Sequence, residues 1–232
     1  MYYSSIIMVY KDRSSILFLI TISLLLIILM PKVIFAAVGC TLSDPDRDIK
    51  RFFPESTGYK TDFITVKQRG GDILIKEVEE KLKDKLDPIF ETADVAHAYY
   101  TVLKGEKIIG RVHGINQKGI YGGMQLILAT DLEGRILEFY YQKISSLEAN
   151  KFKSKEFTDQ FKGLTLADFY HHDSVRETAS ESGRIAKIKD PSGKSSADFK
   201  ITLRGIKENL ILLDIFWLNR KYDNYFNKIK NN

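Results

Sequence analysis

The sequence of 232 residues contains one cysteine, Cys40, and four histidines. A single cysteine excludes an internal disulfide, a Cys-x-x-Cys redox pair, a zinc–thiolate cluster and an iron–sulfur site within one chain. The histidines form neither an HExxH motif nor an i,i+4 pair, so a metal site has little support. The sequence therefore offers no recognisable thiol-based or metal-based chemistry.

An excess of charge of one sign is also missing. The chain has 35 lysines and arginines against 30 aspartates and glutamates, a net charge of +5. Basic residues are interleaved with acidic ones, which argues against a nucleic-acid partner. No serine, histidine and aspartate stand in a recognisable hydrolase order, so no catalytic residues are assigned. With 44% hydrophobic residues the composition is that of an ordinary folded domain.

One long hydrophobic run lies near the N-terminus. Residues 15–30 carry no charge and follow Lys11 and Arg13, which should stay cytoplasmic by the positive-inside rule. Small residues before Cys40 resemble a signal-peptide cleavage region and also a bacterial lipobox, in which Cys40 would carry the lipid. Residues 1–40 are thus expected to be an uncleaved membrane anchor, a lipoprotein signal or a cleaved signal peptide. Each alternative places residues 41–232 outside the cytoplasm, in the periplasm or at the cell surface.

Residues 41–232 are expected to form one α+β domain. Four β-rich runs follow one another, at residues 96–103, 107–115, 123–130 and 135–143. Short glycine-bearing turns separate them, which predicts a four-stranded antiparallel meander. An earlier β-rich segment at 61–67 is followed by a turn at Gly70-Gly71.

The segments flanking this meander have helical patterns. Helices are expected at residues 44–52, 73–82, 146–161 and 197–219. Within 146–161, Phe152, Phe157 and Phe161 are spaced to share one face. In the last helix apolar residues recur at three- and four-residue steps. We expect these helices to pack on one face of the sheet.

Three segments in this order carry a resemblance to a known family. Residues 118–124 read KGIYGGM and are followed by a D-x-x-G-x-I turn at 131–136. Residues 156–163 read EFTDQFKG, and residues 190–195 read DPSGKS before the long last helix. Together these segments resemble the FMN-binding domain family. That family includes the extracytoplasmic flavin subunits of the Rnf and sodium-translocating NADH:quinone oxidoreductase complexes.

The resemblance implies an electron-transfer flavoprotein of the cell envelope, with FMN as cofactor and membrane redox proteins as partners. In the family the last Thr of the serine- and glycine-rich loop binds the flavin phosphate, in many members through a phosphoester bond, and Ser195 stands there. Such a loop before a helix N-terminus can supply several donors to a phosphate. The residues assigned to FMN by this resemblance are Tyr121, Gly122, Gly123, Ser192, Gly193, Lys194, Ser195 and Ser196.

The sequence also departs from the family pattern. Lys194 replaces an alanine, and Asp198 brings a carboxylate to the start of the helix, where it would repel phosphate. A family E-T-P-G-L-G segment falls on residues 144–149, where none of it is retained. Three alternatives therefore stand: FMN bound covalently at Ser195, FMN bound without a covalent bond, and no flavin. In the last case the chain would be an envelope binding or assembly module.

Two histidine positions complete the candidates. His113 lies in a β-rich run, where a hydrogen-bonded strand histidine is expected rather than a ligand-binding one. His171-His172-Asp173 is expected to be loop surface rather than a metal site.

Overall fold

The computed structural model describes residues 40–86, 95–171, 183–193 and 196–230. By its internal contacts the chain divides into two units, Met1–Phe35 and Ala36–Asn232, and the description below concerns the second. The expected signal or anchor segment lies outside the described residues, apart from Cys40. No helix within the described ranges combines the length and the low polarity that crossing a bilayer requires.

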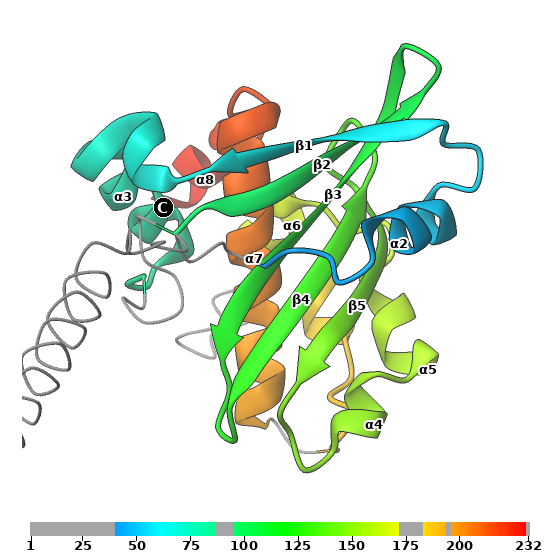
Figure 1. The fold of residues 1–232 in the computed structure, drawn as a ribbon. Coiled ribbons are helices and arrows are strands. Elements are labelled where there is room, and N and C mark those ends of the chain that lie inside the picture. Colours follow the sequence, from blue (N-terminus) through cyan, green and yellow to red (C-terminus); the bar gives the residue numbers. More distant parts are fainter. Residues whose placement is uncertain (1–39, 87–94, 172–182, 194–195, 231–232) are drawn as a thin grey trace, which may run out of the picture. The chain divides into compact units, whose positions relative to one another are not determined.

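The domain is built on one antiparallel sheet of five strands in the order β1-β2-β3-β4-β5 (Figure 1). The strands are β1 (Gly58–Ile64), β2 (His97–Lys104), β3 (Lys107–Lys118), β4 (Gly123–Thr130) and β5 (Ile136–Ile144). This confirms the α+β class and the meander formed by the last four strands. The sheet has one strand more than the four expected. The additional strand is β1, which pairs with β2 from Gly58↔Leu103 to Ile64↔His97.

The helix after β1 begins earlier than expected. The side chain of Thr65 accepts a hydrogen bond from the backbone N–H of Gln68 at 2.9 Å, which caps α3 (Val66–Leu82). This cap ends the strand at Ile64 rather than at residue 67. Gly71, at φ 59° and ψ −151°, interrupts the helix where the Gly70-Gly71 turn was expected. Glycine adopts this conformation without the clash that a Cβ would cause.

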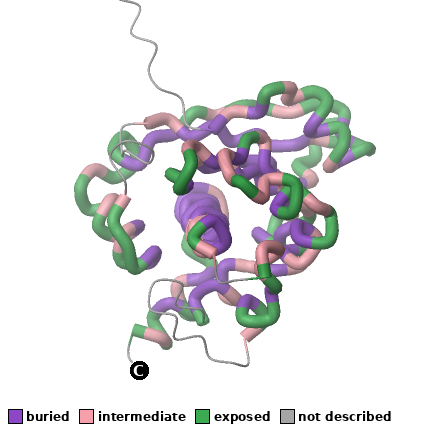
Figure 2. The backbone as a smooth tube through the Cα atoms, turned by 90° about the horizontal axis from the view of Figure 1, so that it is seen from below, coloured by how far each residue is buried: buried purple, intermediate pink, exposed green. Residues whose placement is uncertain are grey.

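The long helix α7 (Ala197–Trp217) lies along one face of the sheet (Figure 1). Its N-cap is Ser196, whose side chain accepts from the N–H of Phe199 at 3.2 Å. Figure 2 views the domain along α7 and shows that buried residues occupy nearly the whole helix. The expected helix at 197–219 is confirmed, with its end at Trp217. Other elements around it are α6 (Leu166–Tyr170), η2 (Ile185–Lys187) and α8 (Asp223–Lys230), none of which was expected.

The segment 146–161 is not the single helix expected from its composition. It forms α4 (Ala149–Phe152), α5 (Lys155–Thr158) and the 3₁₀ turn η1 (Asp159–Phe161). Ser154 is extended, and its hydroxyl accepts from the N–H of Phe157 at 3.3 Å, so it ends one helix and caps the next. The shared apolar face is confirmed, since Phe152, Phe157 and Phe161 are buried in one aromatic cluster.

The opposite face of the sheet is covered by the N-terminal segment of the domain. Residues 40–44 and α2 (Pro45–Phe52) place the side chains of Cys40, Ile49 and Phe53 in a second apolar cluster with alternate residues of β2, β3 and β4. At Gly114 on β3 an added Cβ would lie 2.7 Å from the Sγ of Cys40, so this position has room only for glycine. The expectation that helices pack on one face is therefore wrong for α2.

Candidate functional site

The loop before α7, at residues 190–196, was expected to bind phosphate. Its described part is organised around the carboxylate of Asp190. One oxygen accepts from the N–H of Ser192 at 2.8 Å and from its hydroxyl at 2.7 Å. The other accepts from the N–H of Ser196 at 2.7 Å. Lys194 and Ser195 lie outside the described residues.

Through these hydrogen bonds, the carboxylate of Asp190 occupies the position that a bound anion would take in the loop; it is called the resident carboxylate below. Burial would raise the pKa of Asp190, but the bonds from Ser196 and Ser192 outweigh burial and hold the pKa below its ordinary value. A negative charge here also suits the positive end of the α7 dipole. Asp198 follows in the first turn of α7, is 6% exposed, and its Oδ1 has no hydrogen-bond partner among the described residues. Two carboxylates thus stand at the start of α7.

A second family-like segment contacts this loop. The side-chain oxygen of Gln160, in η1, accepts from the N–H of Lys189 at 2.8 Å, and its nitrogen donates to the Lys189 carbonyl at 3.3 Å. The structure therefore brings segment 156–163 against the loop. A groove of about 730 Å³ opens between them, and its charged lining includes Lys151 and Glu156 as well as Lys189 and Asp190. Its mixed charge gives no preference for a phosphate.

The third segment forms the turn between β3 and β4. The N–H of Gly119 donates to the carbonyl of Gly122 at 2.8 Å, and Gly122 adopts φ 140° against the side chain of Ser145. Gly123 begins β4, and Tyr121 projects outward with 57% of its surface exposed. This turn and the start of α7 lie at the same end of the domain (Figure 1).

A set of buried polar contacts between β3 and α7 was not anticipated. His113 Nδ1 is hydrogen-bonded to Asn209 Oδ1, which confirms His113 as a hydrogen-bonded strand histidine. Burial lowers its pKa to about 4, although the bond to Asn209 acts in the other direction. Further along β3, on the same face as His113, the side-chain nitrogen of Gln117 donates to Glu208 at 2.9 Å. The sequence places His113 and Gln117 on one face of a strand, because they are four residues apart. Only the fold shows that this face of β3 packs against α7.

Arg204 connects this buried contact to the end of α3. Its Nη1 lies 2.6 Å from Gln117 Oε1 and 3.0 Å from Glu208 Oε2, while its Nε lies 2.7 Å from Asp84. The i,i+4 spacing of Arg204 and Glu208 was a signal for their ion pair.

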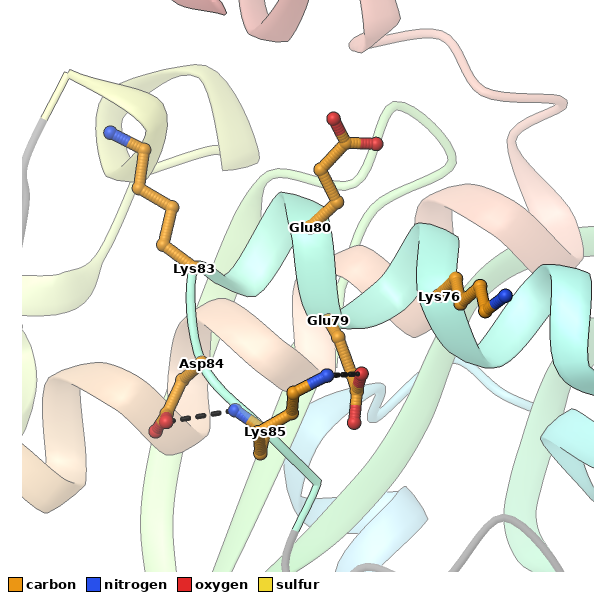
Figure 3. Close-up of a pocket in the computed structure, with 6 residues that line it drawn as sticks. All are labelled: Lys76, Glu79, Glu80, Lys83, Asp84 and Lys85. Carbon is orange, nitrogen blue, oxygen red and sulfur yellow. Dashed lines mark hydrogen bonds and ion pairs between the residues drawn. The ribbon is translucent and has the colours of Figure 1, made fainter.

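Asp84 also borders a shallow surface pocket of about 500 Å³ (Figure 3). Its lining consists of charged residues of both signs: Lys76, Glu79, Glu80, Lys83, Asp84 and Lys85. Lys85 lies 2.5 Å from Glu79 in an exposed ion pair, and its N–H donates to Asp84 at 2.8 Å. These pairs describe a solvated surface that has no set of groups aimed at a ligand.

Comparison with protein-family models and with characterised proteins gave no match. Within the described ranges, no cluster of histidine, cysteine and acidic residues is placed to hold a metal ion. His171 is exposed just after α6, whereas His172 and Asp173 lie outside the described residues.

Proposed function

We propose that this chain is a binding or assembly domain of the cell envelope that carries no flavin in its 190–196 loop. The observation that supports this most directly is the carboxylate of Asp190, which already accepts the hydrogen bonds from Ser192 and Ser196. A flavin phosphate would need the same donors. In the described part of the loop, the carboxylate of Asp190 takes the place that a ligand phosphate would need.

The energies favour the resident carboxylate. Each hydrogen bond to a charged acceptor contributes about 1.5–3 kcal/mol, and a phosphate would have to replace these bonds. A phosphate that entered without displacing Asp190 would meet like charge within a few ångströms, at a cost of about 1–4 kcal/mol per charge. Asp198, buried in the next turn, adds a second negative charge. These terms together correspond to a loss of at least about a hundredfold in phosphate affinity.

An exposed apolar tip offers a surface for a partner protein. Ile120 and Tyr121 are 60% and 57% exposed on the β3–β4 turn, and Leu147 is 80% exposed after β5. The N–H of Ser145 donates to the Gly123 carbonyl at 3.2 Å, which holds these two loops together. Grouped exposed apolar side chains are typical of interaction sites.

The burial of Cys40 bears on how the domain would be held in the cell envelope. Cys40 is 1% exposed, and burial raises the pKa of its thiol to about 12. A lipid on this sulfur would require residues 40–42 to leave the sheet. Its burial supports the two alternatives that leave Cys40 unmodified, the uncleaved anchor and the cleaved signal peptide.

The apolar tip can be tested in intact cells with a photo-crosslinking residue at position 121 and, as control, at Ile73 on α3, which is even more exposed, at 83%. We expect one discrete adduct with a protein of the envelope from position 121 and none from position 73. Changing both Ile120 and Leu147 to Ser should abolish it. Equal labelling from the two positions would refute a role of the tip in assembly.

A second candidate function is electron transfer by bound FMN, favoured by the exposed ring of Tyr121 at the same end of the domain as the loop. In that case the isoalloxazine would do the redox chemistry and the chain would position it for redox partner proteins. Phosphate contacts would come from the loop residues Ser192, Gly193, Lys194, Ser195 and Ser196. Loss of bound flavin in a Tyr121→Ala variant, with the fold retained, would support this candidate over the first.

A further inference from the structure

Arg111 on β3 is a buried arginine that has no carboxylate partner among the described residues. It is 8% exposed, and its Nε has no hydrogen-bond partner among the described residues. Burial is what lowers its pKa, with no carboxylate acting in the other direction. Its guanidinium carbon lies 5.1 Å from the centre of the Trp217 ring, and its charge also acts on the neighbouring His113. A buried guanidinium is costly unless an acceptor compensates for lost water.

The residues on either side of Arg111 are also unsatisfied donors. Thr101 on β2 and Thr130 on β4 are its direct cross-strand neighbours, so the three side chains stand in a row on one face of the sheet. Thr101 is 5% exposed and Thr130 is fully buried. Neither hydroxyl, nor the indole N–H of Trp217, has a hydrogen-bond partner within the described part of the chain. Buried polar groups left unpaired in this way call for a missing partner.

Arg51, on the opposite face of the sheet, provides a comparison because its charge is compensated. Its guanidinium also lies over aromatic rings, 4.4 Å from that of Tyr140 and 4.5 Å from that of Phe52. However, 45% of its side chain is exposed, and its Nε lies 4.0 Å from Glu138. Arg51 therefore has both water and a carboxylate, whereas Arg111 keeps only 8% of its surface exposed and has no carboxylate partner among the described residues.

The end of α7 does not neutralise Arg111. The helix ends at Trp217, and a helix C-terminus offers about half a negative charge, spread over its last carbonyls. The unpaired hydroxyls beside Arg111 lie on the sheet, and they can donate as well as accept. Each of these groups can donate a hydrogen bond to a negatively charged acceptor.

We propose that Arg111, Thr101, Thr130 and Trp217 form a binding site for a small oxyanion, the carboxylate or phosphate group of a solute. The planar guanidinium matches such groups with paired hydrogen bonds, and the two hydroxyls and the indole N–H add further donors. The residual exposure of Arg111 and Trp217 gives the anion a route from solvent. The site lies at the far end of α7 from the 190–196 loop (Figure 1) and does not depend on the function proposed above.

Trp217 is the only tryptophan of the chain and reports on this site directly. The full-length protein is titrated with inorganic phosphate, with acetate and with chloride at constant ionic strength, while its tryptophan emission is recorded. We expect a saturable change with phosphate, with acetate or with both, and none with chloride. A response to phosphate alone would assign the site to phosphate groups, and a response to acetate alone would assign it to carboxylates.

The variants separate binding from general salt effects. Arg111→Met should weaken the anion response at least about tenfold, because a charged hydrogen-bond donor is lost. Arg51→Met removes an arginine from the opposite face and should leave the response unchanged. Should Arg111→Met fail to fold, the isosteric double variant Thr101→Val/Thr130→Val tests the same site and should also weaken the response. The proposal is overturned if no oxyanion gives a saturable change, or if a folded variant of Arg111 or of the two threonines responds as the wild type does.

Discussion

The backbone N–H of Ser196 donates to Oδ2 of Asp190 at 2.7 Å, and this contact joins the two ends of the loop that precedes α7. The same carboxylate accepts from Ser192, so one side chain satisfies donors on both sides of the loop. In a phosphate-binding loop those donors would face a ligand. Here the chain supplies its own anion, and that difference decides what the domain is expected to bind.

Removing the resident carboxylate should expose the donors of the loop. We expect Asp190→Ala to lower the free energy of unfolding by about 1–3 kcal/mol, the range for hydrogen bonds to a charged group. Phosphate should restore part of this loss, so its stabilising effect should be larger in the variant than in the wild type. Urea unfolding of both proteins with and without phosphate measures this. An equal phosphate effect in the two proteins would show that the loop donors do not form an anion cradle.

The only thiol of the chain reports on the docking of residues 40–44. Because Cys40 is buried and its thiol pKa is raised to about 12, a thiol reagent should label the folded protein far more slowly than the unfolded protein. Gly114→Ala should destabilise the domain by about 1–3 kcal/mol and accelerate labelling, since the new Cβ would lie 2.7 Å from the Cys40 sulfur.

Gly58→Ala is the matched control for this prediction. Gly58 is also a strand glycine, but nothing lies within 4 Å of an added Cβ. Its substitution should leave the labelling rate of Cys40 unchanged. Rapid labelling of Cys40 in the folded wild type would contradict the packing of this segment on the sheet.

Arg204 holds a buried carboxylate in place between α7 and β3. Arg204→Met should destabilise the fold by about 3–5 kcal/mol, because Glu208, 1% exposed, would lose its cationic partner. Adding Glu208→Gln should recover part of this loss, so the double variant should be more stable than the sum of the single effects predicts. Chemical denaturation of the wild type, the two single variants and the double variant measures the four free energies of unfolding that this cycle requires.

The control is an arginine at the surface. Arg135 is paired with Asp131 at 3.7 Å with 53% of its side chain exposed, so Arg135→Met should cost less than about 1 kcal/mol. If Arg135→Met and Arg204→Met lowered the free energy of unfolding by similar amounts, the buried ion pair of Arg204 would contribute no more than a surface pair.

Acid should destabilise the domain through its buried histidines. Burial lowers the pKa of His97 from 6.5 to about 4. Above about pH 6.5 the residue is neutral in both states, and between about pH 6.5 and 4 only the unfolded state takes up the proton. Its contribution to stability is therefore present at neutral pH and is lost as the pH falls, by at most about 3 kcal/mol.

The variant His97→Leu removes this titration. The fall in unfolding free energy between about pH 7 and pH 4.5 should be smaller in the variant than in the wild type, as measured by urea unfolding across that range. An unchanged fall would show that His97 does not titrate differently in the folded and unfolded states. His113 has a pKa lowered in the same direction and contributes separately.

The meander and α7 could be predicted because their signals are local. Glycine-bearing turns separate β2, β3, β4 and β5, and the apolar period of α7 is regular. The pairing of β1 with β2 was missed because α3 separates them in the chain and no local pattern encodes their register. The segment 146–161 was misjudged because the hydroxyl of Ser154 competes with the helix for a backbone N–H.

The sequence assigned residues 121–123 and 192–196 to one site and gave segment 156–163 no place in it. The hydrogen bonds between Gln160 and Lys189 that join this segment to the loop could not be predicted from the motifs. That the carboxylate of Asp190 turns inward to the loop depends on side-chain geometry, which a motif does not contain. Arg111 gave no signal at all, because its burial follows from the packing of α7 on β3.

The central claim, that the 190–196 loop is complete without flavin, is tested most directly by the flavin content of the full-length protein purified from its membrane or envelope fraction. Visible absorbance, titration with added FMN and mass spectrometry of the peptide that contains Ser195 together cover bound, bindable and covalent flavin. The account predicts a colourless protein that takes up no FMN and an unmodified Ser195 peptide. Stoichiometric flavin on that peptide, or saturable FMN uptake that Ser196→Ala abolishes, would contradict it.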